Sequence, residues 1–301
     1  MTNPILVVGS IAFDDVETPF GKRLNALGGS AFYFALAAAP FTASRIVGVA
    51  GRDYPENAVK LLRTHRVDTR GLTIVEGKTF RWGGVYHSDV NQRDTLYTEL
   101  NVFADFKPVI PPEFRQTPFL FLGNIQPTLQ LAVLKQMDNP KYVALDTMNL
   151  WINTALDELL AVIKKVDLLI INDSELLLLT RETNLATGLE KLHQLGPQHI
   201  IIKKGEHGAF LSCNAELFYS PAFPIRQATD PTGAGDSFAG GLLGYLSTQN
   251  TTDFTALKRA LVYGCVTGSF AVEAFSADGL LNLTLAIIES RYQALRRLVT
   301  I

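Results

Sequence analysis

The stretch DPTGAGDSFAGG at positions 230–241 places a carboxylate, Asp236, directly after a run of small residues. The apolar residues that follow predict a helix, and the start of a helix suits an anion such as phosphate. A carboxylate there makes chemical sense if it takes a proton from a group that then attacks the phosphate. We therefore predict Asp236 as a general base and the amides of Gly233, Ala234 and Gly235 as an anion hole. The alternative is that Asp236 only complements the helix dipole.

The bulk composition excludes several classes of protein. The chain has 301 residues, of which 47% are hydrophobic, and a formal net charge of -2, so it has no basic surplus to attract nucleic acid or an anionic membrane. Its two cysteines, Cys213 and Cys265, show no disulfide or zinc spacing, which favours a reducing cytoplasm. The N-terminus lacks the basic region of a signal peptide, and no apolar run reaches the roughly 18 residues of a membrane span.

Short apolar runs alternate with segments of helical periodicity. Strands are predicted at 5–10, 43–51, 118–124, 142–148, 167–172 and within 199–212, and helices at 30–41, 55–67, 128–137, 173–182 and 236–247. Strands that alternate with helices imply a parallel sheet covered by helices on both faces. The polar motifs of the chain follow predicted strands, at the edge where open α/β sheets bind their ligands.

The segment 78–106 interrupts this alternation. It is rich in aromatic residues, has no helical period, and contains DVNQRD, which is typical of a hairpin turn between two strands. We interpret it as an antiparallel lid inserted into the α/β core, with an ordinary edge hairpin as the alternative. Because no repeat or linker is found, we predict a single domain over 1–301 with the lid at about 78–106.

The stretch at 230–241 resembles the C-terminal signature of the ribokinase-like (PfkB) family of sugar and nucleoside kinases, and the resemblance extends along the whole chain from GSIAFD at 9–14. It implies the ribokinase-like fold, a mostly parallel sheet covered by helices on both faces with a small β lid. In that family the Asp of the G-A-G-D element is the catalytic base and the preceding amides form the anion hole. By resemblance, Asp236 is the base here.

The acceptor side of the site is implied by two N-terminal motifs. LGGSAFYFALAAA at 27–39 is similar to the family signature in which Gly28 and Gly29 open a helix and contact the sugar, although such a pair alone also fits a plain helix start. In GSIAFD, Asp14 matches the family Asp that binds neighbouring hydroxyl groups, with Asp15 as the alternative, and a solvated turn Asp remains the other interpretation.

One position departs from the family pattern on this side. Tyr33 stands where the family often has Asn, four positions after the second glycine. We expect Tyr33, together with Trp82 of the lid, to flank the acceptor, and this favours a ring-bearing, nucleoside-like acceptor over a free hexose. The alternative is that Tyr33 belongs to the core and that Trp82 packs in a dimer formed through the lid.

The donor side is implied by two further motifs. NDSE resembles the family N-x-x-E motif, so Asn172 and Glu175 are expected to organise the phosphates and a hydrated Mg²⁺, although the same pattern is a helix capping box. KKGEHG resembles the nucleotide loop, with Gly205 and Gly208 matching. Lys203 replaces the usual Thr and can reach a phosphate as a point charge, or it is a surface lysine at a strand end.

The resemblance implies a function and its cofactors. We expect an ATP-dependent kinase that uses Mg²⁺ and transfers the γ-phosphate to a hydroxymethyl group of a sugar, sugar phosphate or nucleoside. Asp230 and the Thr232 carbonyl match positions that hold K⁺ in some family members. The alternative is a non-catalytic member that binds sugar or nucleotide without turnover. The expected partners are small molecules, with no nucleic acid or membrane, and a second copy bound through the lid.

Overall fold

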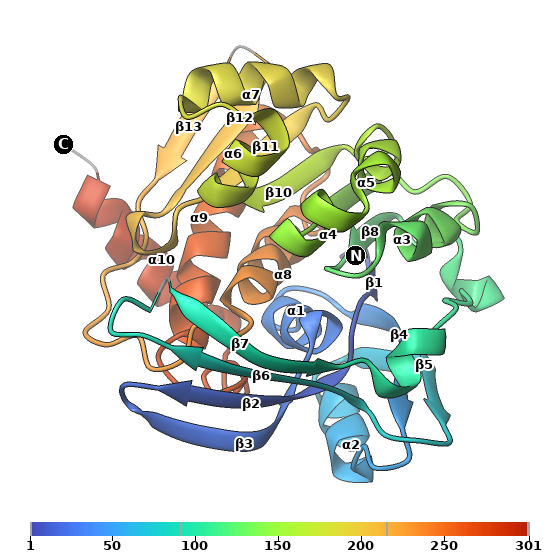
Figure 1. Ribbon diagram of the computed structural model, residues 1–301. Helices are drawn as coiled ribbons and strands as arrows, with labels where there is room; N and C mark the ends of the chain where they lie inside the picture. Colours follow the sequence, from blue (N-terminus) through green and yellow to red (C-terminus); the bar gives the residue numbers. More distant parts are fainter. Residues whose placement is uncertain (1, 91, 215, 300–301) are drawn as a thin grey trace.

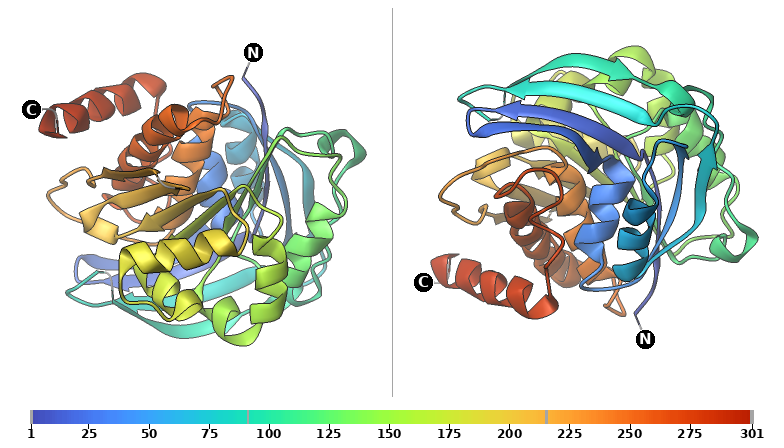
Figure 2. Two further views of the ribbon diagram at one scale, coloured as in Figure 1. Left: turned by 90° about the horizontal axis from the view of Figure 1, so that it is seen from above. Right: turned by 90° about the horizontal axis from the view of Figure 1, so that it is seen from below.

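The computed structural model describes residues 2–90, 92–214 and 216–299 (Figures 1 and 2). Its main sheet has nine strands in the order β13-β12-β11-β10-β9-β8-β1-β4-β5. These strands are β1 (Ile5–Val8), β4 (Ser44–Gly51), β5 (Val67–Val75), β8 (Phe119–Leu122), β9 (Tyr142–Asp146), β10 (Leu168–Asn172), β11 (His199–Lys203), β12 (Ala209–Cys213) and β13 (Glu216–Ser220). All neighbours from β5 to β11 are parallel, and β12 and β13 are antiparallel, so the predicted mostly parallel sheet is confirmed.

Helices cover both faces of this sheet (Figure 2). One layer contains α1 (Ser30–Ala38), α2 (Glu56–Thr64), α8 (Ala234–Leu246), α9 (Phe254–Ala271) and α10 (Leu285–Val299). The other contains α3 (Pro127–Leu134), α4 (Asn149–Thr154), α5 (Leu156–Ile163), α6 (Asp173–Thr180) and α7 (Leu185–Gln194).

The central strand β1 shows why two layers are required. Its four residues are all fully buried. Successive side chains of a strand point to opposite faces, so Ile5 and Val7 join the apolar cluster under α1 and α8, while Leu6 and Val8 join the cluster under α3 and α5. A strand that is apolar on both faces needs helices on both faces.

A second sheet of four strands has the order β3-β2-β6-β7 and lies below α1 and α8 in Figure 1. Its strands are β2 (Ala12–Thr18), β3 (Gly21–Gly28), β6 (Phe80–Tyr86) and β7 (Arg93–Glu99), followed by the 3₁₀ turn η1 (Asn101–Asp105). The antiparallel pair β6–β7 lies where the sequence predicted a hairpin. The strands β2 and β3 were not predicted, because most of β3 is exposed and polar and shows no apolar alternation.

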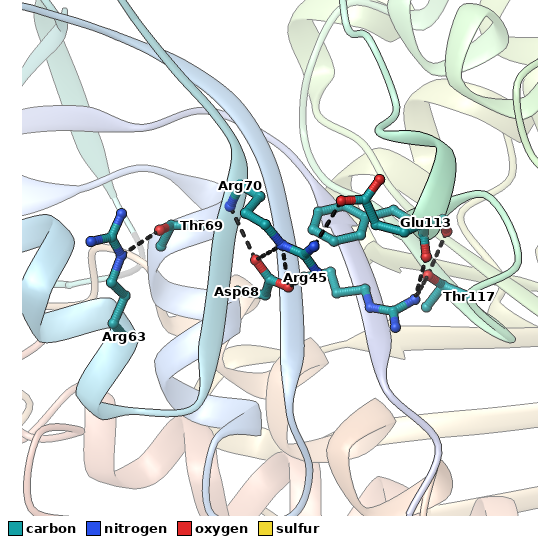
Figure 3. Close-up of polar contacts among 8 residues, drawn as sticks. Arg45, Arg63, Asp68, Thr69, Arg70, Glu113 and Thr117 are labelled. Carbon is teal, nitrogen blue, oxygen red and sulfur yellow. Dashed lines mark hydrogen bonds and ion pairs between the residues drawn. The ribbon is translucent and has the colours of Figure 1, made fainter.

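The connection from this second sheet back to β8 is anchored by a cation–π cluster, and Figure 3 shows the polar contacts of its two arginines, Arg45 and Arg70. The guanidinium groups of Arg45 and Arg70 lie 5.2 and 5.3 Å from the centre of the Phe114 ring, at the end of the 3₁₀ turn η2 (Pro112–Phe114). Arg70 also forms an ion pair of 2.8 Å with Glu113. These contacts hold the connection against β4 and β5. None of the helices among the described residues is both long and apolar enough to span a membrane.

Candidate active site

The three amides predicted to form an anion hole lie at the start of α8. Gly233 has φ +73°, and a Cβ there would lie 2.3 Å from the Tyr33 ring, so only glycine fits. The N–H of Ala234 donates to the Pro231 carbonyl at 3.1 Å. One of the three predicted amides is therefore already hydrogen-bonded within the protein. Within the described part of the chain, the N–H groups of Gly233 and Gly235 have no protein acceptor and remain able to bind an anion.

Asp236 lies in the first turn of α8 and is half-buried. Its Oδ1 is shielded from water and finds no hydrogen-bond partner among the residues that the structure describes. Loss of hydration, and then the charge of Asp146, raise the pKa of Asp236 to about 8; the Lys203 ammonium opposes this shift, and Asp14 adds to it. A shielded carboxylate oxygen without a partner is costly for the fold and is the kind of group that active sites retain.

Asp14, on β2, lies on the acceptor side of Asp236. Its Oδ2 accepts a hydrogen bond from the Tyr33 hydroxyl at 3.5 Å. A Cβ on Gly28 would lie 1.9 Å from the same Oδ2, so the missing side chain of Gly28 makes room for the carboxylate. Burial, and then the charge of Asp230, raise the pKa of Asp14 to about 7.

Asp15 occupies the opposite face of β2. Its carboxylate accepts hydrogen bonds from the Tyr97 hydroxyl and, at 2.6 Å, from the Asn25 N–H, and it forms an ion pair of 3.4 Å with Arg81. Consecutive residues of a strand point in opposite directions, so only one of the two aspartates can face Asp236. The geometry favours Asp14.

Gly29 and Tyr33 fix the entry of α1 against the two sheets. Gly29 has φ +97°, and a Cβ there would lie 2.4 Å from the Ser10 carbonyl oxygen. Tyr33 is only 1% exposed, and its ring packs on Gly233. The ring of Tyr33 is therefore part of the packing of the site, and its hydroxyl is the group that lies beside Asp14.

On the donor side, Asn172 and Glu175 form a complete capping box at the start of α6. The Glu175 N–H donates to the Asn172 side-chain oxygen at 2.8 Å, and the Asn172 N–H donates to the Glu175 carboxylate at 2.8 Å. Glu175 is nevertheless buried, and burial raises its pKa to about 7, with the Lys203 ammonium opposing the shift. The capping role is present, and the carboxylate also faces the charged centre of the site.

Lys203 is the cation of that centre. Its Nζ donates to the Asp146 carboxylate at 3.1 Å, and a Cβ on Gly235 would lie 3.0 Å from the same Nζ. Burial alone would lower the pKa of Lys203, but the charges of Asp146 and Glu175 outweigh burial and raise it. Asp146 was missed by sequence reasoning, although a carboxylate at the carboxyl end of a buried strand was a signal that could have found it.

The loop between β11 and β12 contains the other two predicted nucleotide residues. Gly205 has φ +53° and accepts a hydrogen bond of 3.1 Å from the Gly208 N–H. Gly208 has φ +92°, and a Cβ there would lie 2.1 Å from the Ser220 carbonyl oxygen. Turn geometry and packing explain both glycines, and their contact with a nucleotide stays a prediction.

The residues present fit the expected cations. Mg²⁺ in kinase sites is held by one or two carboxylates together with water and substrate phosphates, and the buried carboxylate of Glu175, whose charge acts on Lys203 beside the anion hole, matches that requirement. Among the described residues, no group of three or more His, Cys, Asp or Glu side chains forms a metal cage. Asp230 accepts hydrogen bonds of 2.8 Å from the Thr232 and Ser276 N–H groups, and its carboxylate retains lone pairs for a monovalent cation.

Comparison with known families establishes the family of the chain. The pfkB family carbohydrate kinase model matches residues 5–282. The chain belongs to this family. The predicted resemblance and the ribokinase-like fold are therefore confirmed, and the protein is a phosphotransferase that uses an alcohol group as acceptor.

Individual relatives agree with this assignment. The chain is 29% identical to a cytidine kinase of Thermococcus kodakarensis over 246 residues, a stretch that covers 79% of this chain and 87% of the relative. The structure of a nucleoside kinase from Methanocaldococcus jannaschii is similar with a TM-score of 0.77 at 20% identity, over 97% of this chain and 98% of the other. A ribokinase II candidate from E. coli, in complex with ATP and Mg²⁺, gives a TM-score of 0.80 at 18% identity, over 97% and 99%.

Proposed function

We propose that this pfkB family member is an ATP-dependent kinase that transfers the γ-phosphate to a hydroxymethyl group of a sugar, sugar phosphate or nucleoside, with Asp236 as the general base. The observation that carries the proposal is the place of the Asp236 carboxylate, whose Oδ1 is shielded from water and has no hydrogen-bond partner among the described residues. It interacts electrostatically with Asp14 on the acceptor side, and with Asp146 and Lys203 on the donor side.

The chemistry follows from this placement. The acceptor oxygen attacks the γ-phosphorus, a new P–O bond forms, and the bond to the β–γ bridging oxygen breaks, so that ADP leaves. Asp236 takes the proton of the acceptor hydroxyl, and the free N–H groups of Gly233 and Gly235 bind the negative charge that develops on the phosphoryl oxygens. Asp14 orients the acceptor by accepting hydrogen bonds from its neighbouring hydroxyl groups.

The donor side supplies positive charge and orientation. A bound Mg²⁺ would supply positive charge that offsets the negative charge of the phosphates. Glu175 and Asn172 would hold the hydrated cation and the phosphates, and Lys203 adds a fixed cation on the same side. The loop with Gly205 and Gly208 would lie along the nucleotide.

The lid is proposed to close over the acceptor within a single kinase domain spanning 1–301. The Thr232 hydroxyl donates to the Tyr86 hydroxyl at 3.2 Å, which joins β6 to the loop before Asp236. Trp82 pairs with Asp14 in the register of β6 and β2, so the two side chains share a face of the lid. Closure would exclude water, which competes with the acceptor.

We infer that the acceptor carries a ring, as a nucleoside does. Because the Tyr33 ring is packed against Gly233, the aromatic face offered to the acceptor comes from Trp82, while the hydroxyl of Tyr33 and the carboxylate of Asp14 remain for its hydroxyl groups. The similarity to a cytidine kinase supports the same class of acceptor.

Transfer of labelled phosphate from ATP across a panel of nucleosides, free sugars and sugar phosphates tests the function. Turnover that is lost in Asp236→Asn, with ATP affinity retained, is expected. Absence of turnover with every acceptor, or full activity of the variant, contradicts the proposal. Higher specificity constants for free sugars than for nucleosides would overturn the ring-bearing acceptor while leaving the kinase assignment in place.

K⁺ activation is also proposed, through Asp230 and the Thr232 carbonyl. Asp230 is 1% exposed, and burial raises its pKa, so a bound cation would offset the cost of its negative charge. Rates measured in K⁺, Na⁺ and tetramethylammonium buffers are expected to be highest in K⁺. Equal rates in the three buffers would remove this site.

A second copy of the chain is proposed to bind through the lid. Leu24 on β3 and Leu96 on β7, the two edge strands of the second sheet, are 54% and 61% exposed and offer apolar surface to a second copy. Light scattering over a range of concentrations is expected to give a dimer that Leu96→Lys dissociates. A wild-type monomer at all concentrations contradicts it.

A further inference from the structure

The strand order brings an aspartate and a lysine together that are far apart in the sequence. Asp146 is the last residue of β9 and Lys203 is the last residue of β11, and β10 lies between these strands. The Lys203 side chain therefore reaches past the end of β10, where Asn172 stands, to donate to Asp146 at 3.1 Å.

This pair is buried at the centre of the site. The side chains of Lys203 and Asp146 are 19% and 8% exposed. The Lys203 Nζ lies 3.0 Å from the position of a Cβ built on Gly235, so the ammonium group borders the anion hole itself. Glu175 and Asp236 are close enough for their charges to act on Lys203, but among the described side chains the hydrogen-bond partner of its Nζ is Asp146.

We propose that Asp146 is a positioning residue that holds the Lys203 ammonium group beside Gly235, where this ammonium binds an oxygen of the phosphoryl group as it is transferred. The proposal rests on the proposed kinase function. A lysine side chain has a flexible four-carbon stem and loses much conformational freedom when it is fixed, so a dedicated partner is needed to keep its charge at one point.

The pairing also explains how the site tolerates both charges. A buried ion loses its hydration and is costly when it has no partner, and removing one member of a buried pair leaves the other uncompensated. Without Lys203, Asp146 would add negative charge next to Glu175 and Asp236, where a triphosphate must bind. Without Asp146, the Lys203 ammonium would be drawn towards Glu175, whose charge acts on it next most strongly, and away from its place beside Gly235.

A double-mutant cycle tests the inference, with kcat, KM for ATP and calorimetric ATP affinity measured for Asp146→Asn, Lys203→Met and the double variant. Loss of a donor to the transferred group costs about 10²–10³-fold in kcat, which is the loss expected for Lys203→Met. Asp146→Asn is expected to lower kcat by at least about tenfold, and in the Lys203→Met background to cost little more, because the two residues act as one unit.

The pair Lys60–Glu56 within α2 provides a matched control away from the site. It also joins a lysine to a carboxylate, at 2.9 Å, but its side chains are 64% and 82% exposed. Lys60→Met is expected to leave kcat and ATP affinity at wild-type values. Equal losses in Lys60→Met and Lys203→Met would show a general charge effect and overturn the inference.

The remaining outcomes separate this inference from the function on which it rests. If the wild type transfers phosphate and the two substitutions are additive, the pairing is wrong and the kinase assignment stands. If extra Mg²⁺ restores Asp146→Asn whatever stands at 203, Asp146 serves the metal and the inference is overturned. If Asp146→Asn does not fold, the comparison of Lys203→Arg with Lys203→Met tests the inference instead. Lys203→Arg keeps a cation that can pair with Asp146 and is expected to retain a much higher kcat than Lys203→Met. Equal kcat values in these two variants would contradict the inference.

Discussion

Asp236→Asn is expected to remove activity and to stabilise the fold in a pH-dependent way. Burial and neighbouring carboxylates raise the pKa of Asp236 from 3.8 to about 8, so the folded protein keeps a proton that the unfolded chain releases. Because the folded state binds more protons, the contribution of this group to stability is full below the unfolded pKa and falls as the pH rises towards the folded pKa. Asn does not ionise and carries no such penalty.

The magnitude follows from the shift. Each unit between the unfolded pKa and the working pH costs about 1.4 kcal/mol, up to the folded pKa. From 3.8 this gives a penalty of about 2 kcal/mol at pH 5 and about 4 kcal/mol at pH 7. The free energy of unfolding of Asp236→Asn should therefore exceed that of the wild type by an amount that grows by about 1.4 kcal/mol per pH unit in this window.

Urea unfolding at several pH values, together with kcat, provides the assay. Ser237→Ala is the control, because Ser237 is the next residue of α8, is fully buried, and also has an oxygen without a partner among the described residues, but does not ionise. Its stability curve should run parallel to that of the wild type. Asp236→Asn should lose about 10²–10⁴-fold in kcat. A stability difference that does not change with pH would refute the raised pKa, and retained kcat would refute the base.

Three further predictions concern the same site. The wild-type kcat/KM should rise with pH towards about 8 as Asp236 ionises, and a flat profile across neutral pH would contradict its role as base. Gly28→Ala should raise KM for the acceptor with little effect on ATP affinity, because the new Cβ would lie 1.9 Å from the Asp14 Oδ2 and force the carboxylate to move. Titration with the acceptor and with ATP checks this. A left-handed backbone conformation costs a residue with a Cβ about 1–2 kcal/mol. Gly233→Ala should destabilise the fold by more than this, because the Tyr33 ring also occupies the Cβ position, and an unchanged urea midpoint would argue against it.

The sequence by itself determined the class of fold and led to the proposed base of the site. Apolar runs of strand length alternate with helical patterns, and that local period indicates a parallel sheet with two helical layers. The stretch at 230–241 holds the proposed base and the amides of the proposed anion hole within four consecutive residues, so local spacing alone brings Asp236 next to the amides. Both features depend on neighbours in the sequence, which is why they could be predicted without coordinates.

Only the tertiary structure decided which distant residues share the site. Asp146 and Lys203 are separated by 57 positions and meet because β9, β10 and β11 end at one edge of the sheet. The orientation of Asp14 towards the site depends on the register of β2, whose polar partner β3 has no apolar alternation to reveal it. Charges, burial and strand register are properties of the packed chain, and a linear pattern carries them only where the interacting groups are also neighbours in sequence.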